Sequence, residues 1–188
     1  MMRNRRDILD KVVCEIHIEH ICRAAEALPD GSGYKPLEEI ESRAFFYSPN
    51  KSIKRALSRV VSAHDLRRTM VLPAGMIMGR HPPTDGGFYS AANIPIINLI
   101  AGPPYLLSED DVPAFVAESE LERVVRAIAD LAGELDGIPA AVLGRKPTND
   151  RKTAEFLDLL DNLGSEEVYF KRLSRLYQVE RFFDRFRR

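Results

Sequence analysis

The segment RAFFYSPNKSIKRALSRVVSAHDLRRTMVL, residues 43–72, predicts a strand, a helix and a second strand in succession. Its beginning is rich in aromatic side chains, which are common in strands. Asn50 or Ser52 then provides a side chain that can cap a helix. Over residues 51–64 the apolar side chains recur at helical spacing, and the apolar run at 69–72 predicts the second strand. This order of elements is typical of a layered α/β domain.

Three further segments continue the pattern on both sides of residues 43–72. Residues 11–18 alternate between two faces as a strand does, and the continuous apolar run at 96–100 predicts a strand covered on both faces. Residues 118–135 form the strongest predicted helix, with Gly137 at the position of a C-cap. We therefore predict an α/β fold with a mixed, mostly parallel sheet flanked by helices. The apolar stripe of the long helix, expected to face the core, consists of Leu121, Val124, Val125, Ile128, Leu131 and Leu135.

The connecting segments contain many of the glycines and prolines. Residues 23–42 are expected to form an irregular excursion with one short helix at most. Residues 73–87, with four glycines and three prolines, are expected to form a loop, and residues 138–150 a connector. We divide the chain into an α/β domain, residues 1–140, and a connector with C-terminal helices, residues 141–188.

The composition is that of an ordinary globular protein. The chain has 188 residues, of which 45% are hydrophobic and 29% charged, and its formal net charge is −1. These values fit one domain with a single core and argue against nucleic acid or a membrane surface as partner. No apolar run is long enough to cross a bilayer and no signal peptide is evident, so we expect a cytoplasmic protein. Cys14 and Cys22 are expected to be buried, reduced thiols.

Several short motifs follow one another in a particular order. IHIEHIC, residues 16–22, places an acid, Glu19, near the end of a predicted strand. Thr-Asp-Gly-Gly-Phe at 84–88 and Asn-Ile-Pro at 93–95 then precede a second predicted strand, and Tyr105 follows it. Taken in this order, the motifs resemble the C-terminal half of the bimetallic zinc aminopeptidases and of their carboxypeptidase relatives.

The resemblance covers residues 10–136 and implies a partial zinc-exopeptidase-like fold with a C-terminal helical extension. It implies that Glu19 occupies the position of a zinc ligand. It also implies that Asp85, Tyr105 and His81 lie at the substrate pocket.

The same resemblance indicates what the chain lacks. Leu106 stands where the family has a zinc-binding histidine, and the other ligands of the family belong to an N-terminal half for which this chain has no room. Hydrolysis by paired zinc ions needs several convergent ligands, whereas Glu19 supplies one carboxylate. We therefore expect an aminopeptidase-related, hydrolase-like pseudoenzyme that is inactive alone and needs no cofactor. Zinc is expected only if a complementary N-terminal half supplies ligands, as in a split metallopeptidase.

The polar end of the first strand has two interpretations. On a strand, His17 and Glu19 share a face, and His20 is expected to point the other way. The group is then either a metal site or a set of hydrogen-bonded polar side chains at the end of a strand. The helical H-E-x-x-H signature of one-metal proteases is absent from the sequence.

Three further residues with functional chemistry also have structural explanations. His81 lies in a loop rich in glycine and proline, and is either solvated or catalytic. His64 ends a predicted helix, where a cation complements the helix dipole. Asp85 either caps the turn that follows it or lines the pocket.

The C-terminal region lies outside the resemblance. Helices are predicted at 150–163 and 165–186. Residues 165–188 combine an aromatic face with a basic side, which is typical of an amphipathic helix docked on its own domain. The alternatives are a homo-oligomer contact and a partner-binding helix, which would make the chain a protein-interaction module.

Overall fold

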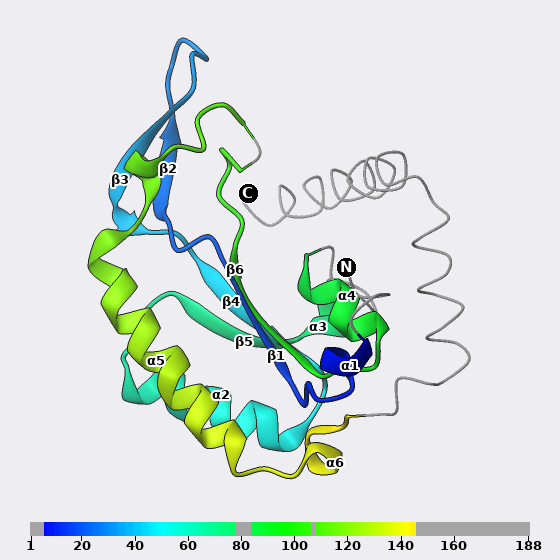
Figure 1. Cartoon of the computed structure of the whole chain (residues 1–188). Coiled ribbons are helices and arrows are strands. Elements are labelled where there is room, and N and C mark those ends of the chain that lie inside the picture. Colours follow the sequence, from blue (N-terminus) through cyan, green and yellow to red (C-terminus); the bar gives the residue numbers. More distant parts are fainter. Residues whose placement is uncertain (1–5, 78–83, 107, 146–188) are drawn as a thin grey trace, which may run out of the picture.

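A computed structural model of the chain describes residues 6–77, 84–106 and 108–145 (Figure 1). These residues build a central sheet with helices on both faces, and a two-stranded hairpin extends beyond one end of the sheet. The helices predicted at 150–163 and 165–186 lie outside the described residues.

The described residues form one four-stranded sheet, with the strands in the spatial order β1 (Glu15–Glu19), β6 (Ile96–Ala101), β4 (Arg43–Tyr47) and β5 (Thr69–Pro73). β1 runs parallel to β6, and β4 runs parallel to β5, whereas β6 and β4 are antiparallel. The predicted α/β class with a mixed, mostly parallel sheet is therefore confirmed. β1 and β5 are the two edges of this sheet.

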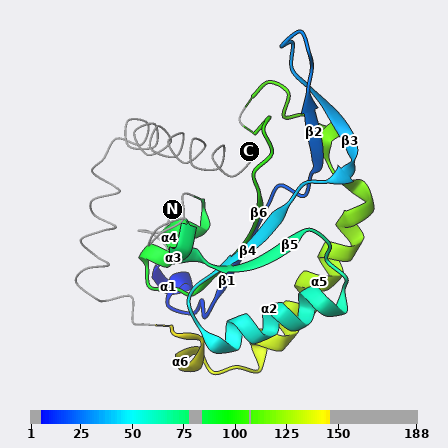
Figure 2. The ribbon, with the colours of Figure 1, turned by 180° about the vertical axis from the view of Figure 1, so that it is seen from behind.

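Helices cover the two faces of the sheet unequally. The long helices α2 (Lys51–Ala63) and α5 (Glu118–Asp136) pack on one face, which we call the two-helix face (Figure 1). The short helices α1 (Arg6–Leu9), α3 (Ala74–Ile77) and α4 (Gly86–Ala91) lie over the opposite, short-helix face. Seen from behind, α2 lies on the β5 side of the sheet and α5 on the β1 side (Figure 2).

The predicted ends of the two long helices are confirmed. The side chain of Asn50, rather than that of Ser52, caps α2, because its Oδ1 accepts hydrogen bonds from the backbone N–H groups of Ser52 and Ile53 at 2.8 and 3.2 Å. Gly137 is the C-cap of α5. α2 therefore begins at a capping side chain and α5 ends at a glycine, as local sequence signals indicate, whereas Ala117, the N-cap of α5, makes no side-chain capping bond.

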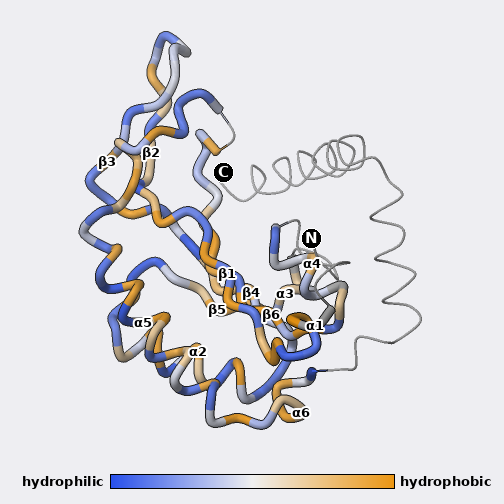
Figure 3. The backbone as a smooth tube through the Cα atoms, in the orientation of Figure 1, coloured by the Kyte–Doolittle hydropathy of each residue, from blue (hydrophilic) through white to orange (hydrophobic). Residues whose placement is uncertain are grey.

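The main core lies between the sheet and the two long helices. Phe45 of β4 and Leu99 of β6 meet Leu57 of α2 and Leu131 of α5, and all four side chains are buried. Apolar residues line the strands and the inner sides of these helices (Figure 3). Burial of apolar area from both layers is what holds the helices on this face.

The buried side of α5 differs from the predicted stripe. Leu121 and Val125 were expected in the core, and that prediction is wrong, since 38% and 63% of their surfaces are exposed. Glu120 is buried instead, because its Oε2 accepts a hydrogen bond from Nη2 of the buried Arg43 at 2.9 Å. With Glu120 paired to Arg43, the side of α5 that faces the core differs from the side with the most apolar residues. The buried residues of α5 are Glu120, Val124, Ala127, Leu131 and Leu135.

The expected irregular excursion at 23–42 is also wrong, because this segment is a hairpin. β2 (Arg23–Ala27) pairs antiparallel with β3 (Tyr34–Ile40). The turn between them uses Gly33, whose φ of +141° is accessible to glycine but not to other residues. Pro36 lies inside β3 and obscures the strand pattern in the sequence.

Two further predicted irregular segments contain short helices. α3 and the start of α4 fall within the expected loop at 73–87, and α6 (Ala140–Leu143) falls within the expected connector at 138–150. Both cysteines are free thiols; Cys22 is buried, whereas Cys14 is only partly buried. In the described part of the chain, no helix is long and apolar enough to cross a membrane.

Candidate functional site

Acidic and imidazole side chains alternate along β1 on the short-helix face. Glu15, His17 and Glu19 are two residues apart and therefore point to the same side of the strand. Oε1 of Glu15 lies 3.8 Å from Nδ1 of His17, and Nε2 of His17 lies 3.2 Å from Oε2 of Glu19. The predicted common face of His17 and Glu19 is thus confirmed, and Glu15 joins them.

The row continues past the end of the strand, where the orientation predicted for His20 is wrong. His20 has a φ of +56°, a left-handed conformation that turns the chain at the end of β1. Its Nδ1 consequently lies 3.8 Å from Oε1 of Glu19, and its Nε2 lies 3.8 Å from Oδ2 of Asp111 in the loop after β6. We call these five side chains the acid–imidazole row: Glu15, His17, Glu19, His20 and Asp111.

Burial changes the protonation of one end of this row. The side chain of Glu15 is 13% exposed. Desolvation raises the pKa of its carboxyl group from 4.5 to about 7; the His17 imidazole lowers it, and the nearby carboxylate of Asp85 raises it further. Burial therefore favours the protonated form of the Glu15 carboxyl group.

A buried amide next to the row fixes the position of α4. Asn98 of β6 is opposite His17 in the parallel register and is fully buried. Its Nδ2 donates a hydrogen bond to Oγ1 of Thr84 at 3.3 Å. A Cβ atom on Gly86 would lie 2.2 Å from Oδ1 of Asn98, so only glycine lets α4 approach β6 this closely. The Thr-Asp-Gly-Gly motif thus has a packing explanation.

Asp85 does not make the capping bond that was one of its two interpretations. It occupies the N-cap position of α4 with helical dihedral angles, and its side chain makes no capping hydrogen bond. The side chain is exposed, and its charge contributes to the raised pKa of Glu15. Asp85 therefore influences the acid–imidazole row electrostatically.

Partnerless buried polar atoms gather at this place. Among the described residues, three buried side-chain atoms lack a hydrogen bond: Oε2 of Glu15, Nδ1 of His20 and Oδ1 of Asn98. Two belong to the row and the third to the amide beside it. Since buried polar atoms usually have partners, this is the part of the described chain that a proton, a water molecule or a polar ligand would satisfy.

Tyr105, assigned to the substrate pocket by the resemblance, lies in a separate apolar cluster. Its ring is fully buried, with its centroid 4.1 Å from that of Phe115 and 6.2 Å from that of Tyr34. Its hydroxyl donates a hydrogen bond to the carbonyl oxygen of Arg23 at 2.9 Å, and burial raises its pKa. In this position Tyr105 joins the loop after β6 to the hairpin.

Glu19, the position of a metal ligand by resemblance, contacts two imidazoles but belongs to no convergent ligand set. Within the described residues, no three His, Cys, Asp or Glu side chains gather closely enough to hold a metal ion. Zinc requires ligand atoms about 2.0–2.3 Å from one point, whereas the row is drawn out along β1 with contacts of 3.2–3.8 Å. As placed, these residues do not fit a zinc ion.

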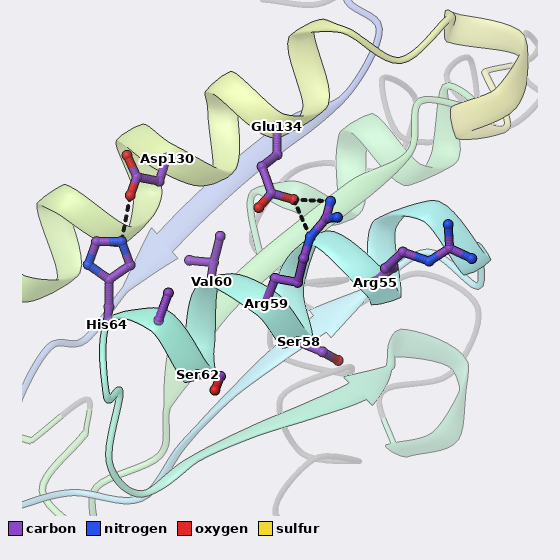
Figure 4. Close-up of a pocket in the computed structure, with 9 residues that line it drawn as sticks. Arg55, Ser58, Arg59, Val60, Ser62, His64, Asp130 and Glu134 are labelled. Atoms are coloured by element: carbon purple, nitrogen blue, oxygen red, sulfur yellow. Dashed lines mark hydrogen bonds and ion pairs between the residues drawn. The ribbon is translucent and has the colours of Figure 1, made fainter.

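A shallow groove on the other side of the molecule lies between α2 and α5 (Figure 4). Arg59 donates to Oε2 of Glu134, and Nε2 of His64 lies 2.7 Å from Oδ2 of Asp130. His64 is the C-cap of α2, as expected from its place at the end of that helix. Arg59 and His64 thus join α2 to α5 across the groove, and Arg55 also lines it.

The sequence identified part of the site and missed part. His81 lies outside the described residues. Glu15 was missed, although the alternation Glu-x-His-x-Glu in a strand signals it. Asn98 and Asp111 were missed because only the parallel pairing of β1 with β6 brings them to the row.

Comparison with other proteins leaves the family open. No protein-family model, no curated protein and no solved structure matches this chain.

Proposed function

We propose that this chain is a zinc-exopeptidase-like domain that does not hydrolyse peptides on its own and acts as an interaction subunit. The observation that carries the proposal is the pair of contacts that the Glu19 carboxylate makes. Its two carboxylate oxygens lie against His17 and His20 in an extended row. By the resemblance, Leu106 stands at the position of a zinc-binding histidine of the zinc exopeptidases. A dizinc hydrolase needs convergent donors on two metals, and this arrangement supplies none.

The position of Tyr105 supports the same proposal. A pocket residue that contacts a peptide has to present its polar group to the substrate. The hydroxyl of Tyr105 instead satisfies a backbone carbonyl under the hairpin. The hydroxyl of Tyr105 therefore anchors the loop that follows β6 to the hairpin of this chain.

The test is a hydrolysis assay on the isolated full chain. Aminoacyl-nitroanilide substrates are supplied with and without added zinc, and bound zinc is measured by elemental analysis. We expect no turnover above background and less than one zinc ion per chain. Stoichiometric zinc together with turnover that Glu19→Gln abolishes would overturn the proposal.

A second function, one half of a split metallopeptidase, is favoured by the composition of the row. His17, Glu19, His20 and Asp111 follow one another in a row toward one end of β1, and imidazole and carboxylate groups are donors that zinc accepts. A complementary half would have to supply the remaining ligands and draw these donors together. The complex isolated from native cells would then contain zinc, and Glu19→Gln would reduce its zinc content. A native complex free of zinc rejects this alternative.

A further inference from the structure

In the described part of the chain, no strand lies next to the outer edge of β1. Among the described residues, β1 pairs with β6 on one side only. β1 contains no proline, so its outward backbone groups are available to another strand. Ile18, which points to the two-helix face beside Leu99, is 44% exposed. Strands of parallel pairs are normally covered on both faces, so the residues that the structure describes leave this edge incomplete.

The helix beneath this edge is incomplete on the same side. Asp130 and Glu134 of α5 contact α2. Arg123 of α5 donates to the carbonyl oxygen of Asp65, which follows the C-cap of α2. At 100° per residue, Leu121 and Val125 lie on the flank of α5 opposite to those contacts. This is the flank toward β1, because α5 lies on the β1 side of the sheet (Figure 2). An exposed apolar flank therefore lies next to an unpaired strand edge.

The spacing of the layers determines what fits there. Strands are about 4.8 Å apart and a helix with its side chains is about 10 Å wide, so one helix covers about two strands. α2 covers the β4–β5 side and α5 the β6–β1 side. A continuation of the sheet by two strands therefore requires one more helix against the flank of Leu121 and Val125.

We infer that two copies of this chain associate by antiparallel pairing of their β1 strands about a two-fold axis at Ile16, forming one continuous sheet. The axis passes through the sheet, so each α5 lies beside the α5 of the other copy, and the exposed flanks cover each other. A two-fold interface uses the same patch on both copies, so the exposed Leu121 and Val125 of each copy would face those of the other.

The polar side chains of β1 favour this register. With the axis at Ile16, Glu15 lies opposite His17 of the second copy, twice, and Cys14 lies opposite Ile18. A carboxyl group and an imidazole are complementary hydrogen-bonding groups, and side chains that bond across strands stabilise a sheet. With the axis at His17, Glu15 would face Glu19 of the second copy, and like charges directly opposite are destabilising. With the axis at Ile18, the pairing would have to include His20, whose left-handed φ ends the strand.

This inference names a partner for the interaction role proposed above and rests on that role in no other way. The absence of hydrolysis is tested separately by the nitroanilide assay. Failure of the dimer therefore leaves the assay result standing, and the reverse also holds.

The register makes a direct prediction for cross-linking. Residues opposite each other in an antiparallel pair have Cα atoms about 4.5–5.5 Å apart, within the range for disulfides. Ile18→Cys should therefore form two disulfides per dimer with the native Cys14 of the second copy under mild oxidation. Ile18→Cys combined with Cys14→Ser should form none of these, and Met70→Cys on the β5 edge should not cross-link to Cys14.

The association itself is measured by light scattering after size exclusion on the full chain. We expect a dimer for the native protein and a dissociation constant at least about tenfold higher for Val125→Glu. Met70→Glu, on the other sheet edge and similarly exposed, should leave the dimer unchanged, and circular dichroism verifies that each variant is folded. A native protein that is monomeric at all concentrations, or a dimer that neither cross-links through residue 18 nor responds to Val125→Glu, overturns the inference. Binding to a different protein without self-association has the same consequence.

Discussion

The two edges of the sheet are built differently. β5 ends at Pro73, which has no N–H to offer another strand, and the helix α2 packs beside it. β1 has no proline and lies beside the exposed flank of α5. Natural sheets protect edges that must stay free with proline or short strands. The contrast teaches that, within the described residues, the β5 edge combines a terminal proline with a neighbouring helix, whereas the β1 edge has neither a proline nor a covered helix flank beside it.

The largest expected effect comes from removing the buried charge pair that joins β4 to α5. The guanidinium of Arg43 donates to Oγ1 of Thr69 on β5 and to Oε2 of Glu120 on α5, and the pair is buried. Arg43→Ala removes the hydrogen-bonded partner of the buried Glu120 and leaves it, among the described residues, only Nε of Arg123, 3.7 Å from its Oε1, so the cost should approach about 3–5 kcal/mol, that of a broken buried pair. Chemical denaturation should show this loss in the free energy of unfolding.

The control is a second substitution at the same pair. Arg43→Met combined with Glu120→Leu removes both charges and should recover much of the loss, because replacing both partners by apolar groups is often close to neutral. Equal destabilisation by the single and the double variant would show that the charge pair does not hold this side together.

The next effect concerns the cover of the acid–imidazole row on the β1 side. Gly86→Ala places a methyl group against Oδ1 of Asn98 and should cost about 1–3 kcal/mol, because a packed site cannot absorb the extra volume. Gly75→Ala in α3 meets no atom within 4 Å and is the matched control. Urea unfolding of both variants measures the difference. Equal stability of the two would mean that α4 does not rest on Asn98 as described.

A third effect is a pH dependence of the free energy of unfolding that arises from Glu15 of β1. Burial raises the pKa of Glu15 to about 7, so the folded state binds its proton more tightly than the unfolded state does. The stabilisation is fully present below about pH 4.5, the unfolded pKa, and is lost as the pH rises through about 7.

Glu15→Gln, which stays neutral, should therefore gain stability relative to the native chain between pH 5 and pH 8. We expect a gain on the order of 1–2 kcal/mol, measured as unfolding free energy at both pH values. Glu26→Gln, at an exposed position of the hairpin, should show no such trend. A pH-independent difference for Glu15→Gln would contradict the raised pKa.

The smallest effect concerns the N-cap of α2, on the β5 side of the sheet. Asn50→Ala removes the cap of α2 and the hydrogen bond from its Nδ2 to the carbonyl oxygen of Val142 at 2.7 Å. Loss of a cap costs about 1 kcal/mol, so thermal unfolding should occur at a lower temperature. Asn50→Asp keeps the acceptor and should lose less. Equal losses would show that the capping bonds contribute little.

Prediction from the sequence succeeded where a signal was local. The helix at 51–64 and the strand at 43–48 were found because periodicity and capping are read from neighbouring residues. The hairpin at 23–42 was missed because Pro36 breaks the alternation. The orientation of His20 was wrong because a left-handed residue at the end of a strand leaves no periodic trace. The resemblance to zinc exopeptidases, with its consequences for Glu19, remains a prediction.

By itself the sequence determined the α/β class, the long helices with their caps, and the common face of His17 and Glu19. These follow from periodicity, because the spacing of side chains along a helix or strand is fixed by backbone geometry. Only the tertiary structure decided that Asn98 and Asp111 reach the row, that Glu120 is buried in place of Leu121, and which strands form the edges of the sheet. Each of these depends on which distant segments pair, and that choice is made by the packing of the whole chain.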